Sequence, residues 1–490
     1  NDATIELDPV AVATVATTRN AIDDLANDPE PHYGISTGFG ALATQFIPLD
    51  LRVQLQKSLV RSHAAGSGAE VEREVIRGLM AQRLSTLMTG RTGVRTVVVE
   101  TYAAMLNAGI TPIVREYGSL GCSGDLAPLS HCALALMGEG EVRDAHGEVK
   151  DAADALAAAG ISPVELREKE GLALINGTDG MTAMLVLAIR DLRHLLRVAD
   201  VAVSLSLEGL RGNAAVFADD LQELRPHPGQ RASASNIRTL LEGSALVHGD
   251  RTAETVRVQD AYSLRCSPQV HGAARDTVDH AARVAGHELN SAIDNPVVTH
   301  DYRVESNGNF HGAPVGYVLD FLAIAVADVA SMSERRTDRF LDKARNFGLP
   351  PFLAEQAGVD SGLMIAQYTA AGIVSELKRL AVPASVDSIP SSAMQEDHVS
   401  MGWSAGRKLR RSIDGLTRVL AIEILTAARA VAMRTETPSP ALAPVVDLVN
   451  GVTGGPGVDR FLSPAIEAVV DLVGSGRLIS TIESTTGNLD

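Results

Sequence analysis

Apolar residues recur at helical spacing over long proline-free stretches of this chain. No proline lies between Pro163 and Pro226, or between Pro390 and Pro438. Within both stretches the apolar positions fall three or four residues apart, the period of a helix with one buried face. The segments 272–290 and 316–335 follow the same pattern. We therefore predict several helices of roughly 20 to 30 residues, and long helices of this kind pack side by side as a bundle. The apolar positions are Met184, Leu185, Leu187, Ala188, Leu192, Leu195 and Leu196 in the first stretch, and Leu416, Val419, Leu420, Ile422, Leu425 and Ala428 in the second.

The chain before these stretches has a different pattern. Shorter helical segments alternate there with Gly- and Pro-rich loops, which we place at 29–46 and 111–129. A further loop is expected at 227–235, which has Pro226 and Pro228 at its start. The pattern predicts a mainly α protein whose chemistry is carried by loops at one end of a bundle. Its three expected parts are a loop-rich N-terminal domain over 1–185, a central bundle of long helices over 186–435, and a C-terminal helical extension over 436–490.

The composition agrees with packed helices and restricts the possible partners. Only 3% of the 490 residues are aromatic, and 43 Lys and Arg against 60 Asp and Glu give a net charge of -17. An acidic chain lacks the basic patch that would neutralise phosphates, so we expect no nucleic-acid partner. The three cysteines, Cys122, Cys132 and Cys266, are too few for a disulfide framework and do not form a CxxC metal motif. This favours a reducing compartment, the cytoplasm.

Membrane, secretion and metal signals are also weak. The most apolar segment, 315–332, carries Asp320 and Asp328, so we interpret it as a core helix and expect no membrane partner. The chain starts at Asn1 without a secretory pattern and without Met, and we expect a short N-terminal piece to precede it. No HExxH motif, Walker loop or GxSxG elbow is present, and we expect no metal.

The most informative segment is 118–129, which reads GSLGCSGDLAPL. A sharp turn there would let the backbone nitrogen of Gly124 reach the carbonyl carbon of Cys122, and Gly124 has no Cβ to obstruct the approach. Loss of water on ring closure, followed by loss of the Ser123 hydroxyl, would leave an exocyclic C=CH2 group. That group is a strong electrophile, which none of the twenty side chains provides. The alternative interpretation of the segment is an ordinary glycine-rich turn.

The segment resembles the prosthetic-group loop of the aromatic amino acid ammonia-lyases and aminomutases. These enzymes build 4-methylidene-imidazol-5-one (MIO) from Ala-Ser-Gly, and Cys122 stands here where most members have Ala. The Cys122 side chain lies outside the new double bond, so the ring can still form. The resemblance implies MIO as the cofactor, formed from Cys122, Ser123 and Gly124. It also implies an ammonia-lyase, or fumarase–aspartase-like, architecture and a homotetramer with shared active sites.

A second match surrounds Tyr33, in the segment HYGISTGFG at 32–40. The family has a catalytic tyrosine in a very similar segment, and the resemblance implies that Tyr33 is the base. A phenolate is a stronger base than imidazole, which suits removal of a weakly acidic C–H proton. Residues 38–43 also match GxGxxA, but no β-branched strand precedes them, so the pattern is weak evidence for dinucleotide binding.

Further positions match the family's active-site residues. Arg265 is implied to bind the substrate carboxylate, for which a guanidinium offers a bidentate fork. Tyr262 is implied to lie near the prosthetic group and Gln259 to be a polar active-site residue. Asn176 is implied to lie beside the MIO carbonyl, where an amide donor stabilises developing charge, and Phe310 to line the pocket. Taken alone, Arg265 could form a structural ion pair, Asn176 could cap a helix before Gly177, and Phe310 could be a core aromatic.

Two positions bear on the substrate. Ser62 and His63 match the Ser-His pair of histidine-acting family members, whereas the pair is apolar in phenylalanine-acting ones. Glu396 stands where relatives acting on phenylalanine or tyrosine usually have Gln. A carboxylate in an aromatic pocket is costly unless the ligand supplies a donor or a positive charge, and an imidazole does. Taken alone, Glu396 could be a surface glutamate and His63 a core histidine. Met394 departs from the Asn that often precedes this run.

The resemblance at these residues implies a carbon–nitrogen lyase, and we expect it to convert L-histidine to trans-urocanate and ammonia. Two alternatives remain. One is a tyrosine or phenylalanine ammonia-lyase or aminomutase of the same family, and the other is a non-catalytic scaffold that kept the fold. The joint presence of Tyr33, Ser123 and Arg265 argues against the scaffold.

Overall fold

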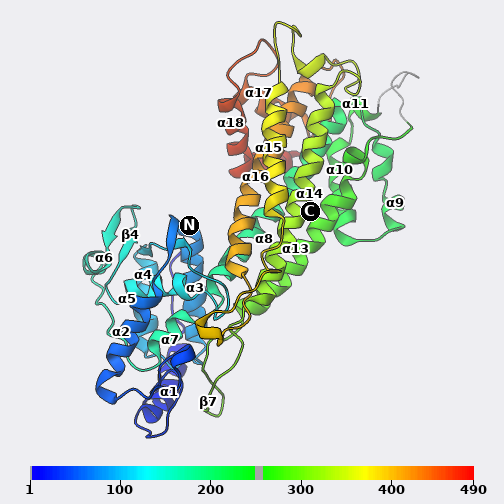
Figure 1. Cartoon of the computed structure of the whole chain (residues 1–490). Helices are drawn as coiled ribbons and strands as arrows, with labels where there is room; N and C mark the ends of the chain where they lie inside the picture. The colour runs from blue at the N-terminus through cyan, green and yellow to red at the C-terminus, as the bar shows by residue number, and fades with distance from the viewer. Residues whose placement is uncertain (1–2, 249–257) are drawn as a thin grey trace. The chain divides into compact units, whose positions relative to one another are not determined.

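The computed structural model describes residues 3–248 and 258–490, and helices make up most of its regular structure (Figure 1). The predicted mainly α fold is confirmed. The chain divides into two compact units, each assembled from three segments. Unit 1 contains Asn1–Leu187, Ala282–Asp320 and Pro383–Arg407, and unit 2 contains Ala188–Ala281, Phe321–Val382 and Lys408–Asp490. The division into 1–185, 186–435 and 436–490 expected from the sequence remains a prediction.

Four long helices account for the proline-free and apolar stretches of the sequence. They have 31, 23, 29 and 31 residues, close to the lengths predicted from the sequence. Each contributes residues to both units. These helices are α8 (Asp179–Gly209), α13 (Ser267–Leu289), α14 (Ala313–Leu341) and α16 (Gly402–Ala432).

Within unit 2 the long helices are joined by a buried polar cluster. The Arg336 guanidinium of α14 donates to both carboxylate oxygens of Glu423 on α16, at 2.5 and 2.8 Å. Ser206 of α8 donates to the same carboxylate at 2.6 Å, and all three side chains are fully buried. The surrounding helices of unit 2 are α9 (Asp219–Glu223), α10 (Pro228–Leu241), α11 (Ala245–His248), α12 (Tyr262–Arg265), α15 (Met364–Leu380), α17 (Ala443–Thr453), α18 (Ser463–Gly474) and α19 (Arg477–Thr486).

Unit 1 combines short helices with small antiparallel sheets. Helices α2, α5 and α7 pack against one another. Strand β1 pairs with β3, β4 lies between β2 and β5, and β6 pairs with β7. The helices are α1 (Pro9–Ala26), α2 (Arg52–His63), α3 (Arg73–Met88), α4 (Thr96–Asn107), α5 (Leu126–Leu136), α6 (Ala152–Ala158) and α7 (Glu170–Ile175). The strands are β1 (Ser67–Glu70), β2 (Thr111–Pro112), β3 (Arg115–Tyr117), β4 (Glu141–Arg143), β5 (Val149–Asp151), β6 (Val297–Val298) and β7 (Val304–Glu305).

Two of the loops expected from the sequence are partly regular structure. The prediction of a loop at 227–235 is wrong, because α10 begins at Pro228 and runs through that segment. The segment 111–129 contains β2, β3 and the first turn of α5, including Pro128. Proline is tolerated in the first turn of a helix, where its missing N–H has no intrahelical partner. These prolines therefore mark helix starts.

Helix α14 is the one described helix long and apolar enough to cross a membrane, with a mean hydropathy of 1.7 over its most apolar window. Length and composition alone do not separate a membrane span from a core helix. In this window 56% of the residues are buried inside the protein. Asp320 is 3% exposed and accepts a hydrogen bond from the Ser385 backbone N–H at 2.7 Å. Such burial is typical of a core helix.

Candidate active site

A cavity of about 770 Å³ lies within unit 1 and collects residues from distant parts of the sequence. Its lining is mostly apolar, with leucines and isoleucines from α2, α5 and α7 and from the 38–47 loop. The polar lining residues include six of those predicted from the sequence: Tyr33, Ser62, His63, Ser123, Asn176 and Glu396.

Helix packing explains how these residues meet. His63 is the last residue of α2, Ser123 precedes α5, and Asn176 is the C-cap of α7. Because the three helices pack together, their ends open into one cavity. The 3-10 turn at 40–42, which follows the Tyr33 loop, contacts the 3-10 turn at 392–394, which precedes Glu396.

The Cys122–Gly124 loop is pressed against the turn that follows Asn176. Gly124 has φ +76°, and a Cβ added there would lie 2.0 Å from the carbonyl oxygen of Gly177. The Asp125 backbone N–H donates to that same oxygen at 2.7 Å. Any side chain at position 124 would therefore be both strained and excluded by backbone, which explains why glycine occupies the turn.

Asp125 holds the other side of this loop, and sequence analysis did not identify this role. Its buried carboxylate accepts the Gly180 and Met181 N–H groups at the start of α8, both at 2.9 Å, and the Ser119 hydroxyl at 2.8 Å. Burial raises the pKa of Asp125 to about 7, although these hydrogen bonds act in the opposite direction. No local sequence signal links Asp125 to α8, because the contact is long-range.

The loop and its surroundings fit the MIO group. Ring formation joins the Gly124 nitrogen to the Cys122 carbonyl carbon with loss of one water, and the Ser123 hydroxyl then leaves as a second water with the Cα hydrogen. The tight glycine turn brings these residues together. Asn176 is 3% exposed, and its Oδ1 has no hydrogen-bond partner among the described residues. Its amide nitrogen donates to the Asn295 carbonyl at 3.3 Å, so a polar group is held beside the loop.

Glu396 contacts the loop directly. The Ser123 hydroxyl donates to Oε1 at 3.1 Å, and the Cys122 thiol donates to Oε2 at 3.1 Å. The Ser391 hydroxyl also donates to Oε2, at 2.9 Å. Burial and the Glu396 carboxylate raise the pKa of Cys122 to about 12, so the thiol keeps its proton at neutral pH. The carboxylate is thus held by three neutral donors.

Tyr33 lies close enough to Glu396 to sense its charge. Its hydroxyl accepts the Gly40 backbone N–H at 3.3 Å. Burial raises the pKa of the phenol above its ordinary value, and the negative charges of Glu396 and Asp294 add to this effect, whereas the Gly40 hydrogen bond lowers the pKa. Tyr33 is therefore a protonated phenol at neutral pH and becomes a strong base when it ionises.

His63 presents an acceptor to the cavity. Its Nδ1 lies 2.9 Å from the Leu59 carbonyl oxygen, which can only accept, so Nδ1 carries the proton. Burial lowers the pKa of His63, although the Leu59 hydrogen bond and Glu396 act in the opposite direction. The ring is therefore neutral at pH 7, and its Nε2 can accept a hydrogen bond from a ligand.

The backbone before Glu396 is strained. Ser392, Ala393 and Met394 all have positive φ, between 50° and 68°. Residues other than glycine rarely adopt this region, and Asn does so more readily than Met. Such strain is typical of functional sites. Asn would therefore fit the backbone at position 394 better than Met394, whose side chain is 71% exposed.

Six predicted residues do not line this cavity: Cys122 and Gly124, which flank the lining residue Ser123, and four residues from other parts of the chain. Gln259, Tyr262 and Arg265 belong to unit 2, where the Arg265 guanidinium lies 4.7 Å from the centre of the Tyr262 ring. Phe310 lies half-buried in the turn before α14. Among the described residues that do line the cavity, none is Arg or Lys. The cavity of a single chain therefore lacks a cationic partner for a carboxylate.

A buried ion pair next to the Tyr33 loop was also missed. The Lys169 ammonium lies 2.5 Å from a carboxylate oxygen of Asp294, and both side chains are fully buried. Asp294 precedes Asn295, whose carbonyl accepts the Asn176 amide. The pair therefore fixes the backbone that positions Asn176. A Lys and an Asp 125 positions apart give no local signal.

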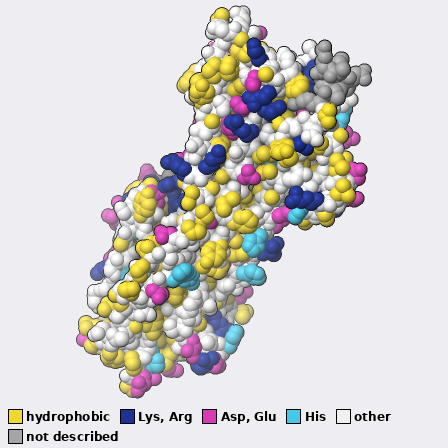
Figure 2. Space-filling model, turned by 45° about the vertical axis from the view of Figure 1, so that its right-hand side comes forward, with side chains coloured by type: hydrophobic (Ala, Val, Ile, Leu, Met, Phe, Trp, Pro, Cys, Tyr) yellow, Lys and Arg dark blue, Asp and Glu magenta, His cyan; other side chains and the backbone are white. Residues whose placement is uncertain are grey.

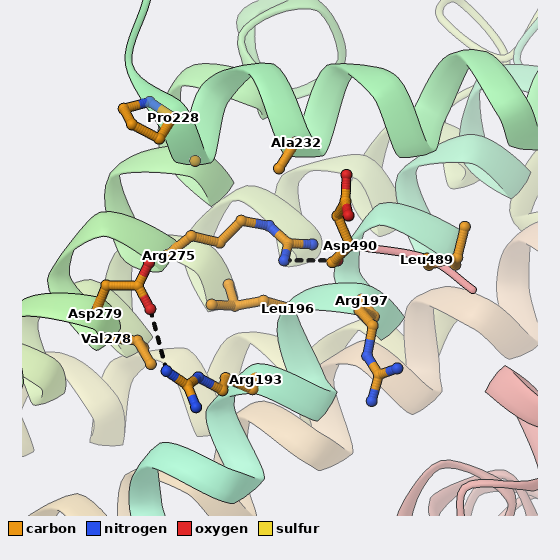
Figure 3. A pocket seen from close by; sticks show the side chains of 11 residues that line it. Arg193, Leu196, Arg197, Pro228, Ala232, Arg275, Val278, Asp279, Leu489 and Asp490 are labelled. Carbon is orange, nitrogen blue, oxygen red and sulfur yellow. Dashed lines mark hydrogen bonds and ion pairs between the residues drawn. The ribbon is translucent and has the colours of Figure 1, made fainter. Parts of the chain in front are cut away.

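A second cavity, of about 460 Å³, lies within unit 2 and is lined by three arginines (Figure 3). None of the residues predicted from the sequence lines it. Each arginine is already paired with a carboxylate, so none of the three is an unpaired cation for a substrate. The pairs are Arg193 with Asp279 (3.2 Å), Arg197 with Glu483 (3.1 Å) and Arg275 with Asp200 (2.6 Å).

Known proteins resemble this chain over nearly its whole length. The histidine ammonia-lyase of Streptomyces griseus is 62% identical over 491 residues, covering 99% of this chain and 95% of that protein. A tyrosine aminomutase from Streptomyces globisporus has a TM-score of 0.94 and 37% identity, covering 100% and 96% of the two chains. A histidine ammonia-lyase from Trypanosoma cruzi has a TM-score of 0.90 and 38% identity, covering 99% and 91%. The model of the aromatic amino acid lyase family matches residues 1–451, and the chain belongs to that family.

Proposed function

We propose that this chain catalyses the non-oxidative elimination of ammonia from L-histidine to give trans-urocanate, a reaction of histidine degradation. The observation that carries the proposal is the placement of Glu396 and His63 in the cavity that also contains Ser123. Both present hydrogen-bond acceptors, and an imidazole side chain supplies donors that a phenyl ring lacks. The relative from Streptomyces griseus, 62% identical, is named histidine ammonia-lyase, which supports the same substrate.

The cofactor is MIO, which supplies an electrophile that takes up the substrate amine and lets it depart. The chain's own residues orient the substrate around it. Glu396 and the neutral His63 hold the imidazole, and the second N–H of the Asn176 amide stabilises negative charge next to the loop. Tyr33 removes the β-proton once its phenol has ionised. The apolar lining excludes water and keeps these groups in fixed positions.

We further propose that the enzyme is a cytoplasmic homotetramer whose active sites draw on more than one subunit. The described residues that line the cavity include no Arg or Lys for the substrate carboxylate, whereas Tyr262 of unit 2 is 69% exposed beside Arg265. A neighbouring subunit that brings Gln259, Tyr262 and Arg265 to this cavity completes the site. Exposed apolar side chains offer surface for such contacts (Figure 2), and they include Phe321, Ile324, Ile365 and Tyr368 of unit 2. The three free cysteines agree with a reducing compartment.

Turnover of L-histidine tests the substrate. We expect a near-ultraviolet absorbance from the conjugated acid with L-histidine, and much slower turnover of L-tyrosine and L-phenylalanine. The intact mass of active protein should be low by two waters. Faster turnover of L-tyrosine than of L-histidine would favour the aminomutase or tyrosine-lyase alternative. L-Tyrosine is the comparison substrate because a tyrosine aminomutase superposes on this chain with a TM-score of 0.94.

Mixed subunits test the shared site. Ser123→Ala and Arg265→Ala subunits should each be inactive alone, because one lacks the electrophile and the other lacks the carboxylate anchor. Co-expressed, they should recover part of the wild-type rate, because some sites combine an intact Ser123 with the Arg265 of another subunit. The same variants purified separately and kept apart are the control. No recovery on co-expression would contradict sharing.

A further inference from the structure

The two oxygens of the Glu396 carboxylate have different partners. Oε2 accepts both the Cys122 thiol, at 3.1 Å, and the Ser391 hydroxyl, at 2.9 Å. Oε1 accepts the Ser123 hydroxyl at 3.1 Å. The Ser123 hydroxyl is lost as water when the MIO ring forms, so the donor to Oε1 is temporary. The donors to Oε2 keep their O–H and S–H groups through that reaction.

We propose that Cys122 and Ser391 are positioning residues that hold Oε2 of Glu396, so that ring formation leaves Oε1 free to accept the imidazole N–H of the substrate. This inference deepens the proposed function and rests on it. Cys122 thereby acquires a role that the Ala of most relatives cannot perform, since Ala has no donor. Loss of the Ser123 hydroxyl as water thus creates the electrophile and also frees the oxygen of Glu396 that binds the substrate.

The chemistry of both donors supports this assignment. A thiol can donate only while protonated, and burial and Glu396 raise the pKa of Cys122 to about 12. Ser391 is held independently of its hydroxyl, because its backbone N–H donates to the Glu396 carbonyl at 2.8 Å and its carbonyl accepts the Glu396 N–H at 3.3 Å. Removing either side-chain donor therefore leaves the backbone pairing of the segment in place. What changes is the freedom of the carboxylate to rotate.

Equilibrium binding to the assembled enzyme tests the assignment without turnover. The probe is 3-(imidazol-4-yl)propanoate, which has the imidazole and carboxylate but no amine to eliminate. The matched ligand is 3-phenylpropanoate, which keeps the carboxylate and lacks the imidazole donor. In wild type the imidazole ligand should bind more tightly. Absence of that preference would overturn the proposed substrate, and the inference with it.

The variants are Cys122→Ala and Ser391→Ala, with Cys122→Ser and Ser391→Thr as conservative rescues that keep a donor. Each Ala variant should weaken binding of the imidazole ligand by about five- to tenfold, the effect of losing one ordinary hydrogen bond, and leave binding of the phenyl ligand unchanged. The rescues should stay close to wild type. In steady state, KM for L-histidine should rise by the same factor with little change in kcat.

Intact mass shows whether each variant has lost two waters. Ser391 lies outside the cyclising tripeptide, so Ser391→Ala tests the inference even if Cys122→Ala matures poorly. Cys132→Ala is the thiol control, because Cys132 is buried in α5, whereas the thiol that donates to Glu396 is that of Cys122. It should change stability and leave both ligands unaffected. Equal weakening of both ligands in the Ala variants, or no weakening of either, would overturn the inference.

Discussion

Glu423 in unit 2 is buried and Glu396 in unit 1 is half-buried, and the two carboxylates have different hydrogen-bond partners. The partners distinguish a structural carboxylate from one that can bind a ligand. Glu423 in unit 2 is fully buried and accepts both arms of the Arg336 guanidinium as well as the Ser206 hydroxyl. Glu396 in unit 1 accepts a thiol and two hydroxyls. The charge of Glu423 is cancelled by a permanent cation, whereas the donors described for Glu396 are all neutral.

The difference lies in what remains to be bound. An ion pair with bidentate geometry is complete, and a further ligand gains nothing from it. A carboxylate held only by neutral donors keeps its negative charge, which favours a ligand with a donor or a positive charge. Both glutamates have a serine donor, so the arginine is the distinguishing feature. Substitutions at the serines and at the carboxylates, and the ionisation of the neighbouring phenol, test this difference.

The serines should give the largest contrast. Ser123→Ala removes the atom that becomes the electrophile, and turnover of L-histidine should fall by about 10³-fold or more, as for other groups that react covalently. Ser206→Ala is the matched change in unit 2, and it should keep turnover while lowering the free energy of unfolding by about 1 kcal/mol. Steady-state rates and urea unfolding measure the two effects. Normal turnover by Ser123→Ala would refute the prosthetic group.

The carboxylates should give the next largest contrast. Glu396→Gln should lower kcat/KM for L-histidine by about 100-fold, because a charged acceptor is lost, and change stability little. Glu423→Gln should lower the free energy of unfolding by about 3 to 5 kcal/mol, because Arg336 is left buried without its partner. KM and denaturant midpoints, measured on both variants, separate these outcomes. If Glu396→Gln left KM unchanged, the basis for the histidine assignment would be lost.

A smaller effect is expected on pH dependence. Burial raises the pKa of Tyr33, and the negative charge of Glu396 raises it further. A base acts only when deprotonated, so kcat/KM should rise with pH as Tyr33 ionises. Removing the charge in Glu396→Gln lowers the pKa of Tyr33 and should move the rising limb to lower pH. Glu423→Gln should leave the rising limb of the pH profile unchanged. A rising limb that moves to higher pH in Glu396→Gln would contradict the assignment of Tyr33 as the base.

The smallest effect concerns the strained turn before Glu396. Met394 has φ +68° and is 71% exposed, so replacing it loses little packing. Met394→Asn introduces a residue that tolerates positive φ, and the free energy of unfolding should rise by about 0.5 kcal/mol. A shift in the thermal midpoint, with intact mass as a check on maturation, measures this. A lower midpoint would mean that the Met394 side chain has a contact of its own.

The sequence predicted the parts of this molecule that have a local signal. The long helices follow from apolar spacing, and the Ser123 loop follows from its glycines and its resemblance to a family. The Pro228 segment was misassigned, because proline both breaks helices and starts them, and only the following residues distinguish the two cases.

Contacts that depend on tertiary packing or on an unusual backbone turn could not be predicted in this way. Asp125 meets the start of α8, and Ser391 meets Glu396 from across a left-handed turn. Neither contact has a characteristic spacing. The expected meeting of Tyr33, His63, Ser123, Asn176 and Glu396 in one cavity is present, whereas Gln259, Tyr262 and Arg265 lie in unit 2 and Phe310 is absent from the lining. Their roles remain predictions.

The contact between Gly124 and Gly177 has a consequence for biosynthesis. The Asp125 N–H binds the Gly177 carbonyl, and the two glycine backbones approach too closely for any side chain between them. A ribosome-bound fragment that ends shortly after Gly124 lacks Gly177 and therefore cannot form this contact. The contact that holds the Gly124 turn is therefore complete only once the later segment has been synthesised and folded.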